Sequence, residues 1–433
     1  MSLFRQLQFL HNVNKNQWKS VEELRELQNK KLRAIIHYAY GNIPFYHNLF
    51  KNENIHPSDI STLEDLNKIP LVTKNDIKEN YPQNIVSKKV NLNKCIIWDT
   101  SGSTGVPLKI AYDKKADDFA KAILLRSYLG NGLKYFDKWC VIGTPDYRNK
   151  KSRGYDYIQK IGFLSPFYIS VFAPLEKKIQ LLEKFRPRVL DCLPTDLFLI
   201  TRYLQEHNIK SIKPKIITTN GEILDDYVRD YVEDFFDVKI SDMVGCFELR
   251  RTAWECSFHE GYHVDIDSIV MQFLKDGEEV SIGEEGKIVY TCLFNYTMPI
   301  IRYDIGDIGI PSSDMCSCGR GLPMMKIMGG KIMDFLTTVD GELISPHIPK
   351  EFLASVLGVE MFKLIQFSKE NIEILIIKNA SYNDESNSMI IKGLKKIFNG
   401  EVDIKIDFVK ELKRDKIKYK VIESKIPLEK NHF

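Results

Sequence analysis

Residues 99–109 read Asp-Thr-Ser-Gly-Ser-Thr-Gly-Val-Pro-Leu-Lys, and this stretch decides how the rest of the chain is interpreted. Its glycines let the backbone adopt positive φ angles and approach a ligand closely. Its serine and threonine hydroxyls add hydrogen-bond donors, and consecutive backbone N–H groups can form a nest for an anion. The stretch lies between two β-rich runs, 95–98 and 108–112. It therefore predicts a loop that binds a polyphosphate.

This loop is not a Walker phosphate loop, because the Gly-x-x-x-x-Gly-Lys-Ser/Thr spacing is absent and no helical pattern clearly follows. A short run of small residues between two strands is also typical of an ordinary hairpin turn. Taken alone, the stretch leaves both interpretations open.

The pattern on either side of the loop predicts an α/β protein. Residues 20–55 are predicted to be helical, with a break at Pro44. From about residue 95, β-rich runs alternate with amphipathic helical stretches, which is typical of an α/β layered domain. The strand runs are 139–143, 189–193, 215–219 and 238–244, and the helical stretches include 196–206 and 224–235.

The chain becomes β-rich after about residue 264, with predicted strands at 269–274, 286–293 and 300–303. A tail then follows in which strands at 362–367 and 372–377, a helix at 385–398 and a strand at 402–408 predict a small α+β domain. A chain of 433 residues is too long for one simple core, so two or three domains are expected.

Composition narrows the class of protein. The formal net charge is +3, and the lysines are spread along the chain rather than gathered in a basic stripe, which argues against a nucleic-acid partner. No run reaches the roughly 20 apolar residues that span a bilayer. Residues 1–10 lack the order of a signal peptide, so we expect a cytoplasmic protein without a membrane partner. Its eight cysteines are then expected to be reduced or bound to metal.

Motifs elsewhere in the chain resemble those of the adenylate-forming superfamily of acyl-CoA synthetases, adenylation domains and luciferases, and they occur in the same order. They are Thr-Ser-Gly-Ser-Thr-Gly-Val-Pro at 100–107, Val-Gly-Cys-Phe-Glu at 244–248, Arg-Tyr-Asp-Ile-Gly-Asp at 302–307 and Gly-Lys-Ile-Met-Asp at 330–334. Runs at 40–46, 63–74 and 316–320 resemble the phenylacetate–CoA ligase branch, which includes capsular-polysaccharide-associated homologues.

The resemblance implies an α/β fold with a large N-terminal domain of several subdomains at 1–333 and a small mobile α+β C-terminal domain at 334–433. It implies an enzyme that adenylates a carboxylic acid with ATP and then transfers the acyl group, with coenzyme A as the default acceptor. An amine or sugar acceptor in polysaccharide or secondary-metabolite biosynthesis is an alternative. A catalytically silent, zinc-stabilised homologue is another. A homodimer is one assembly that the sequence leaves open.

The resemblance also assigns roles to matching residues. Glu248 would bind Mg²⁺, which prefers oxygen ligands, and Asp307 would accept hydrogen bonds from the ribose. The ATP phosphates would be held by Thr100, Ser101, Gly102, Ser103, Thr104 and Gly105, with Thr104 also counted as catalytic. The remaining nucleotide contacts would come from Asn220, Gly221, Glu222, Gly245, Arg302 and Lys331. Asn220 stands where the family has Gly, and Lys331 where it has Arg.

The catalytic lysine is assigned to Lys416, in a segment at 415–422 that resembles the family's Gly-Lys-x-Lys-x-Val-Ile ending. A compact ammonium group would contact the carboxylate and the α-phosphate as a point charge. Because Asp415 replaces the usual Gly and one extra residue precedes Val421, Lys418 is the alternative. Asp334 matches the hinge at which the small domain is expected to rotate.

A zinc site is predicted at Cys256, His263, Cys316 and Cys318, since thiolates and imidazole in a four-ligand set suit tetrahedral zinc. His259 is the alternative nitrogen ligand. A lone buried cysteine is usually a small hydrophobic residue. The Cys-x-Cys pair before a glycine is harder to explain in that way, and the resembling branch carries a similar structural site. We therefore expect a closed zinc site in a β-rich subdomain at about 256–320.

The acyl pocket is expected near Cys246, Phe247, Thr219 and the 144–155 loop. Residues 250 and 251 are both arginine, and one could meet a second carboxylate on the substrate or both could be surface or supporting charges. Tyr147 and Tyr155 would equally suit an aromatic acid. The identity of the acid stays open.

Overall fold

The computed structural model describes residues 2–99, 108–143, 162–327, 336–344, 346–412 and 421–426. Several predicted site residues lie outside these ranges. They are the loop residues 100–105, Tyr147, Tyr155, Lys331, Asp334, Lys416 and Lys418. The predicted domain boundary at 333/334 also lies outside them and stays a prediction. The described residues up to 327 are called the N-terminal unit below, and those from 336 onward the C-terminal unit.

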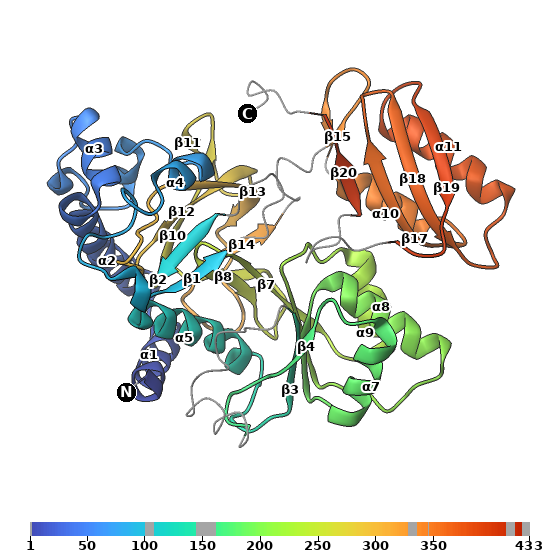
Figure 1. Ribbon diagram of the computed structural model, residues 1–433, viewed down its shortest axis with the longest axis horizontal. Helices are drawn as coiled ribbons and strands as arrows, with labels where there is room; N and C mark the ends of the chain where they lie inside the picture. Colours follow the sequence, from blue (N-terminus) through green and yellow to red (C-terminus); the bar gives the residue numbers. More distant parts are fainter. Residues whose placement is uncertain are drawn as a thin grey trace.

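The chain begins with helices that pack beside the antiparallel part of a large sheet (Figure 1). The second helix starts with a capping box in which Ser20 and Glu23 bond each other's backbone, and its buried side chains recur at helical spacing. Pro44 opens the next helix, so the predicted break is confirmed. The helices are α1 (Ser2–Asn16), α2 (Val21–Asn42), α3 (Pro44–Asn52) and α4 (Lys74–Asn80), with 3₁₀ turns at Pro57–Asp59, Glu64–Lys68 and Leu92–Lys94.

A hairpin carries the predicted phosphate loop. Strands β1 (Ile96–Asp99) and β2 (Lys109–Tyr112) pair antiparallel, with Asp99 opposite Lys109. Residues 100–107, which separate the two strands in the sequence, lie outside the described residues. Helix α5 (Lys114–Gly130) follows β2, and the Asp113 carboxylate caps it by accepting the Ala116 N–H.

The described residues contain a sheet of 12 strands, and its parallel half follows the α/β pattern predicted from the sequence. Strands and helices alternate there, as expected for right-handed crossover units. The strands are β3 (Trp139–Gly143), β4 (Phe167–Ser170), β5 (Val189–Cys192), β6 (Ile216–Asn220) and β7 (Ile240–Cys246). The helices are α7 (Leu175–Phe185), α8 (Pro194–Glu206) and α9 (Asp226–Phe236).

Both faces of this parallel half are covered, and the residues of its central strands β5 and β6 are almost all buried. On one face, Cys140, Leu190 and Ile217 pack with apolar residues of α7, α8 and α9. On the other face, Trp139 and Met243 join the core of the N-terminal helices and α5. Figure 1 shows α7, α8 and α9 together on one side of these strands. In such sheets, ligands bind beyond the carboxyl ends of the strands.

The other half of the sheet is antiparallel and holds the predicted β-rich region. Strand β13 begins at Tyr303, so the prediction of a strand at 300–303 was wrong for all but its last residue. The reason is local, because Arg302 has a φ of 49°, which interrupts an extended backbone. The strands are β8 (Arg250–Glu255), β9 (Tyr262–Val264), β10 (Ile269–Lys275), β11 (Glu278–Glu279), β12 (Gly286–Cys292), β13 (Tyr303–Ser312) and β14 (Met324–Ile327).

The C-terminal unit has its own core and stands apart from the rest of the molecule in Figure 1. Its described strands form a sheet in the order β19-β18-β17-β20, against which two helices pack. Its elements are β15 (Leu336–Thr337), β16 (Leu343–Ile344), α10 (His347–Ser355), β17 (Val359–Gln366), β18 (Asn371–Lys378), α11 (Asp384–Ile397), β19 (Asp403–Phe408) and β20 (Ile422–Ser424). Among the described residues, no helix is long and apolar enough to cross a membrane.

Candidate active site and metal cluster

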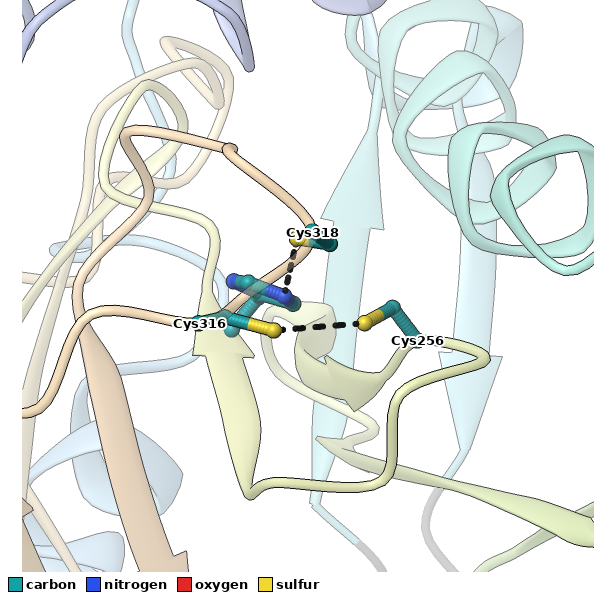
Figure 2. A group of neighbouring side chains, drawn as sticks. Cys256, Cys316 and Cys318 are labelled. Carbon is teal, nitrogen blue, oxygen red and sulfur yellow. Dashed lines mark hydrogen bonds between the residues drawn. The ribbon is translucent and has the colours of Figure 1, made fainter.

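Four predicted ligands meet in one place. The ligand atoms of Cys256, His263, Cys316 and Cys318 all lie within 4.8 Å of one another. The Cys256 and Cys316 sulfurs are 3.6 Å apart, and the Cys318 sulfur is 3.4 Å from Nε2 of His263. Figure 2 shows Cys256 and Cys316 pointing toward each other with Cys318 beside them. These residues come from three separate segments of the chain.

The local fold explains the convergence. Cys256 directly follows β8, and His263 lies on β9, which pairs with β8. Both other cysteines lie in the connection from β13 to β14, where Gly319 has a φ of 79° that favours glycine. The Glu260 carboxylate accepts the Ser317 N–H at 2.7 Å, which fixes this connection against the β8–β9 turn.

The protonation of the cluster suits a metal ion. Nδ1 of His263 lies 3.4 Å from the Leu322 carbonyl oxygen, so an Nδ1–H donates there and the Nε2 lone pair faces the thiols. Burial lowers the pKa of His263 to about 4, so the ring is neutral near pH 7. Burial raises the pKa of Cys256 and Cys316. At Cys318, burial is outweighed by hydrogen bonds from Arg320, and the pKa falls below its ordinary value. Three thiols and a neutral imidazole form a donor set that fits tetrahedral zinc.

The alternative ligand, His259, is not part of this group. It lies in the turn between β8 and β9, and burial lowers its pKa. Of the two nitrogen ligands considered from the sequence, the geometry therefore favours His263.

A buried carboxylate marks the second site. Glu248 lies in the turn between β7 and β8 and is 5% exposed. The Tyr303 hydroxyl, from the start of β13, donates to its Oε1 at 2.9 Å. The Tyr112 hydroxyl, from the end of β2, donates to its backbone carbonyl at 2.7 Å. Two motif-bearing segments and the strand that follows the 100–107 motif therefore meet at Glu248.

Neither tyrosine was assigned a role from the sequence. The sequence did contain an indication for Tyr303, because this residue lies inside the Arg-Tyr-x-x-Gly-Asp motif. Tyr112 had none beyond its place at the end of a predicted strand. Burial raises the pKa of Tyr303 far above its usual range, and the neighbouring Glu248 adds to this effect, so the phenol keeps the proton that it donates.

The predicted adenine segment lies at the carboxyl end of β6. The Asn220 amide donates to Oδ1 of Asp191 on β5 at 2.8 Å, and the Glu222 carboxylate accepts the Thr195 N–H at the start of α8. Gly221 has a φ of 80°, which favours glycine. The asparagine that replaces the family's glycine therefore has its side chain bonded to the neighbouring strand.

Other predicted nucleotide residues have contacts within the protein. Arg302 is 5% exposed, and its guanidinium donates to the backbone carbonyls of Asn67 and Ile69. A Cβ on Gly245 would lie 2.3 Å from the Arg250 carbonyl oxygen, so packing against β8 alone requires glycine there. Asp307 lies on β13. Nucleotide contacts for these residues stay predictions.

The paired arginines have different environments. Arg250 places its guanidinium 3.3 Å from the centre of the Trp98 ring, a cation–π contact. Arg251 is buried and forms an ion pair with Asp265 at 2.7 Å, which agrees with a supporting charge and not with a surface one. Of the other residues expected near the acyl pocket, Thr219 donates to the Asp242 carboxylate at 2.5 Å.

Comparison with known proteins extends these findings. No protein-family model matches the chain. Phenylacetate-coenzyme A ligase of Thermus thermophilus is 25% identical over 333 residues, which cover 73% of this chain and 72% of that protein. Protein CapK of Staphylococcus aureus is 26% identical over 381 residues, which cover 86% of this chain and 82% of CapK.

Solved structures of CoA ligases are also similar to this chain in fold. A 2-hydroxyisobutyryl-CoA ligase in the postadenylation state superposes with a TM-score of 0.80 at 19% identity, covering 94% of this chain and 90% of that chain. In sequence and fold, the chain is similar to the phenylacetate–CoA ligase branch of the adenylate-forming superfamily. An anthranilate CoA ligase is a more distant structural neighbour, with a TM-score of 0.56 at 15% identity over 76% of this chain and 66% of that one.

Proposed function

We propose that this chain is an ATP-dependent acid–CoA ligase that works in two steps. In the first step, a carboxylate oxygen attacks the α-phosphorus of ATP, the bond to the β-phosphate oxygen breaks, and pyrophosphate leaves. In the second step, the thiol of coenzyme A loses its proton and attacks the acyl carbon, and AMP leaves. Positioning and charge neutralisation are the main tasks of the protein in such transfers.

The convergence on Glu248 carries the proposal. The strand that follows the 100–107 loop, the β7–β8 turn and the start of β13 are joined there by two tyrosine hydroxyls. The β7–β8 turn and the start of β13 carry two of the adenylate-forming motifs, and β2 follows a third in the sequence. The buried Glu248 carboxylate is a ligand suited to a hard cation, which supports the proposal that it binds Mg²⁺.

The proposal also includes a magnesium ion and a catalytic lysine. Mg²⁺ bound at the Glu248 carboxylate would neutralise phosphate charge as the α-phosphorus is attacked. Tyr303 holds that carboxylate through Oε1 and so fixes its orientation. Lys416 is proposed to contact the reacting oxygens, with Lys418 as the alternative.

Zinc is proposed as a structural ion at Cys256, His263, Cys316 and Cys318. All four protein ligands belong to one closed group, as in structural sites, whereas a catalytic zinc site keeps a position for water or substrate. The ion would tie the β13–β14 connection to β8 and β9.

Carboxylate-dependent exchange of pyrophosphate into ATP tests the first step. The panel contains aromatic, aliphatic, hydroxy and dicarboxylic acids, and the variants are Lys416→Ala and Lys418→Ala. Exchange with one class of acid that is lost in Lys416→Ala is the expected result. Loss in Lys418→Ala alone would move the role to that residue. ATP binding without exchange for any acid would favour the silent homologue.

The acceptor is tested separately, by AMP release with coenzyme A, with amino sugars or with water alone. Release that depends on coenzyme A supports the ligase. The CapK match covers 86% of this chain, against 73% for the Thermus ligase, and it supports another acceptor as the second candidate. Release with an amino sugar and not with coenzyme A would favour that candidate.

A further inference from the structure

The N-terminal and C-terminal units are joined by two ion pairs among the described residues. Arg202 on α8 lies 2.6 Å from the Glu360 carboxylate on β17. Lys350 on α10 pairs with Asp225, the residue before α9. Both partners in the N-terminal unit belong to the layer that covers the parallel strands. Figure 1 shows α10 and β17 facing α8 and α9 across the gap between the units.

Asp225 links this contact to the nucleotide segment. It lies three residues after Glu222, in the connection from the end of β6 to α9. Its side chain is 3% exposed, whereas that of Lys350 is 26% exposed, so the lysine reaches from the C-terminal unit into the N-terminal unit. A carboxylate this buried is stabilised by a cation that is held close to it. The position of the C-terminal unit is therefore coupled to the charge balance beside the predicted adenine segment at 220–222.

The arrangement of the two units resembles one state of a related enzyme more than another. The 2-hydroxyisobutyryl-CoA ligase gives a TM-score of 0.80 in its postadenylation state and 0.65 in its thioesterification state. Identity is 19% in both comparisons, and coverage of this chain is 94% and 95%. Because the two structures are of the same enzyme, the difference reflects how its parts are placed.

We propose that the Lys350–Asp225 and Arg202–Glu360 pairs hold the C-terminal unit in the arrangement for adenylation, so that these residues are positioning residues for the first step and not for thioester formation. The inference rests on the proposed function. Moving the unit to another arrangement separates both pairs, and a pair that forms in one state shifts the equilibrium toward that state by its differential energy. Removing the pairs then depopulates the adenylation arrangement.

Paired half-reactions test this inference with Lys350→Met and Glu360→Gln, which remove charge and retain most of each side chain. Lys392→Met, on the exposed side of α11, is the control. With the acid that supports exchange, we expect the exchange rate to fall about fivefold to tenfold in the double variant. Thioester formation from coenzyme A and the preformed acyl-adenylate should stay within twofold of wild type. An equal loss in both half-reactions, or no loss in either, would overturn the inference.

A charge swap separates electrostatics from packing. Arg202→Glu alone should slow exchange, and Arg202→Glu combined with Glu360→Arg should restore at least half of the lost rate. Failure of this rescue, with both proteins folded, argues against the pair.

Small-angle X-ray scattering gives a readout that does not depend on activity. The wild-type profile should match the present arrangement, and the Lys350→Met/Glu360→Gln profile should shift to a different distance distribution. Identical profiles would sink the inference. If no acid supports exchange but the profiles differ, the two pairs still set the arrangement, and the proposed reaction is what fails.

Discussion

The Cys/His cluster and the group that Glu248 forms with Tyr112 and Tyr303, called the Glu248 corner, both lie where distant segments of the chain meet. They differ in which groups satisfy their polar atoms. At the corner, the carboxylate already accepts a hydrogen bond from Tyr303. In the cluster, the four ligand atoms lie together, and Nε2 of His263 faces thiols rather than a carbonyl oxygen. The Glu248 carboxylate is satisfied by contacts within the protein, whereas the proposed zinc ion would bind the cluster ligands as thiolates.

The comparison teaches that the two sites should fail differently. Damage to the cluster should weaken the fold, and damage to the corner should weaken the chemistry. The predictions below test this separation.

The largest effect is expected from Cys316→Ser, because it removes one ligand of the proposed zinc site. Losses above about 4 kcal/mol are characteristic of mechanisms such as loss of a metal site. We expect zinc content to fall below half of the wild-type value and the free energy of unfolding to fall by about 4 kcal/mol. Denaturant titration and metal analysis measure these quantities. Cys95→Ser is the control, since Cys95 is not in the cluster; unchanged zinc and stability in Cys316→Ser would contradict the assignment.

Glu248→Gln should reduce adenylation by about 100-fold, equivalent to about 2.7 kcal/mol, because the charge proposed to hold Mg²⁺ is lost. The unfolding midpoint should change little, since glutamine can still accept the Tyr303 hydroxyl. The exchange assay over a range of Mg²⁺ concentrations measures the loss. Near-normal exchange at limiting Mg²⁺ would remove Glu248 from the metal site.

Tyr303→Phe should reduce adenylation by about tenfold, or about 1.4 kcal/mol, because the Glu248 carboxylate loses the donor that orients it. The effect should fall mainly on kcat and on the Mg²⁺ dependence. Tyr290→Phe is a matched control on the neighbouring strand, since Tyr290 contacts Thr252 instead. Equal effects of the two changes would mean that Tyr303 acts through packing alone.

The smallest predicted effect is a change of stability with pH at Asp242, which contacts strand β9 beside the cluster. Tyr262, which precedes His263, donates to Asp242 at 2.9 Å, and burial raises the pKa of Asp242 to about 7. The folded state therefore keeps a proton that the unfolded state has lost between about pH 4 and pH 7. Stability should fall as the pH rises through this window, by at most about 1.4 kcal/mol per pH unit.

Asp242→Asn should flatten that dependence. Thermal unfolding of both proteins at pH 5, 6, 7 and 8 gives the comparison, and what matters is the difference in slope rather than the absolute midpoint. Parallel curves would mean that Asp242 does not retain the proton.

The sequence was a good guide where a signal is local. The run at 139–143 forms a strand with the predicted bounds, because a continuous apolar segment between turn residues has few other ways to be buried. Cys316 and Cys318 were identifiable as candidate ligands because a Cys-x-Cys pair before a glycine is hard to explain as core. Strand boundaries were harder to predict. The positive φ of Arg302 moves the start of a strand to the next residue, and no simple sequence pattern indicates it.

Contacts between distant segments were not predictable. Tyr112 and Glu248 are 136 residues apart, and their contact depends on how the β1–β2 hairpin packs against the β7–β8 turn. The bond from Asn220 to Asp191 similarly requires the alignment of two parallel strands. Such contacts depend on how distant segments pack in the assembled sheet, and no local sequence pattern indicates which residues will meet.

The first helix has a consequence for biosynthesis. The Asn16 amide bonds Asp267, and the Gln17 side chain accepts the Arg320 guanidinium, which is 303 residues later in the chain. At a translation rate of roughly 5–20 residues per second, the second partner follows the first by roughly 15–60 s. A nascent chain can pack Leu10 and Val13 against α5 long before these bonds form. During that interval the Gln17 side chain and backbone carbonyl, which later bond Arg320 and Gly321, stay open to water or to chaperones on the ribosome.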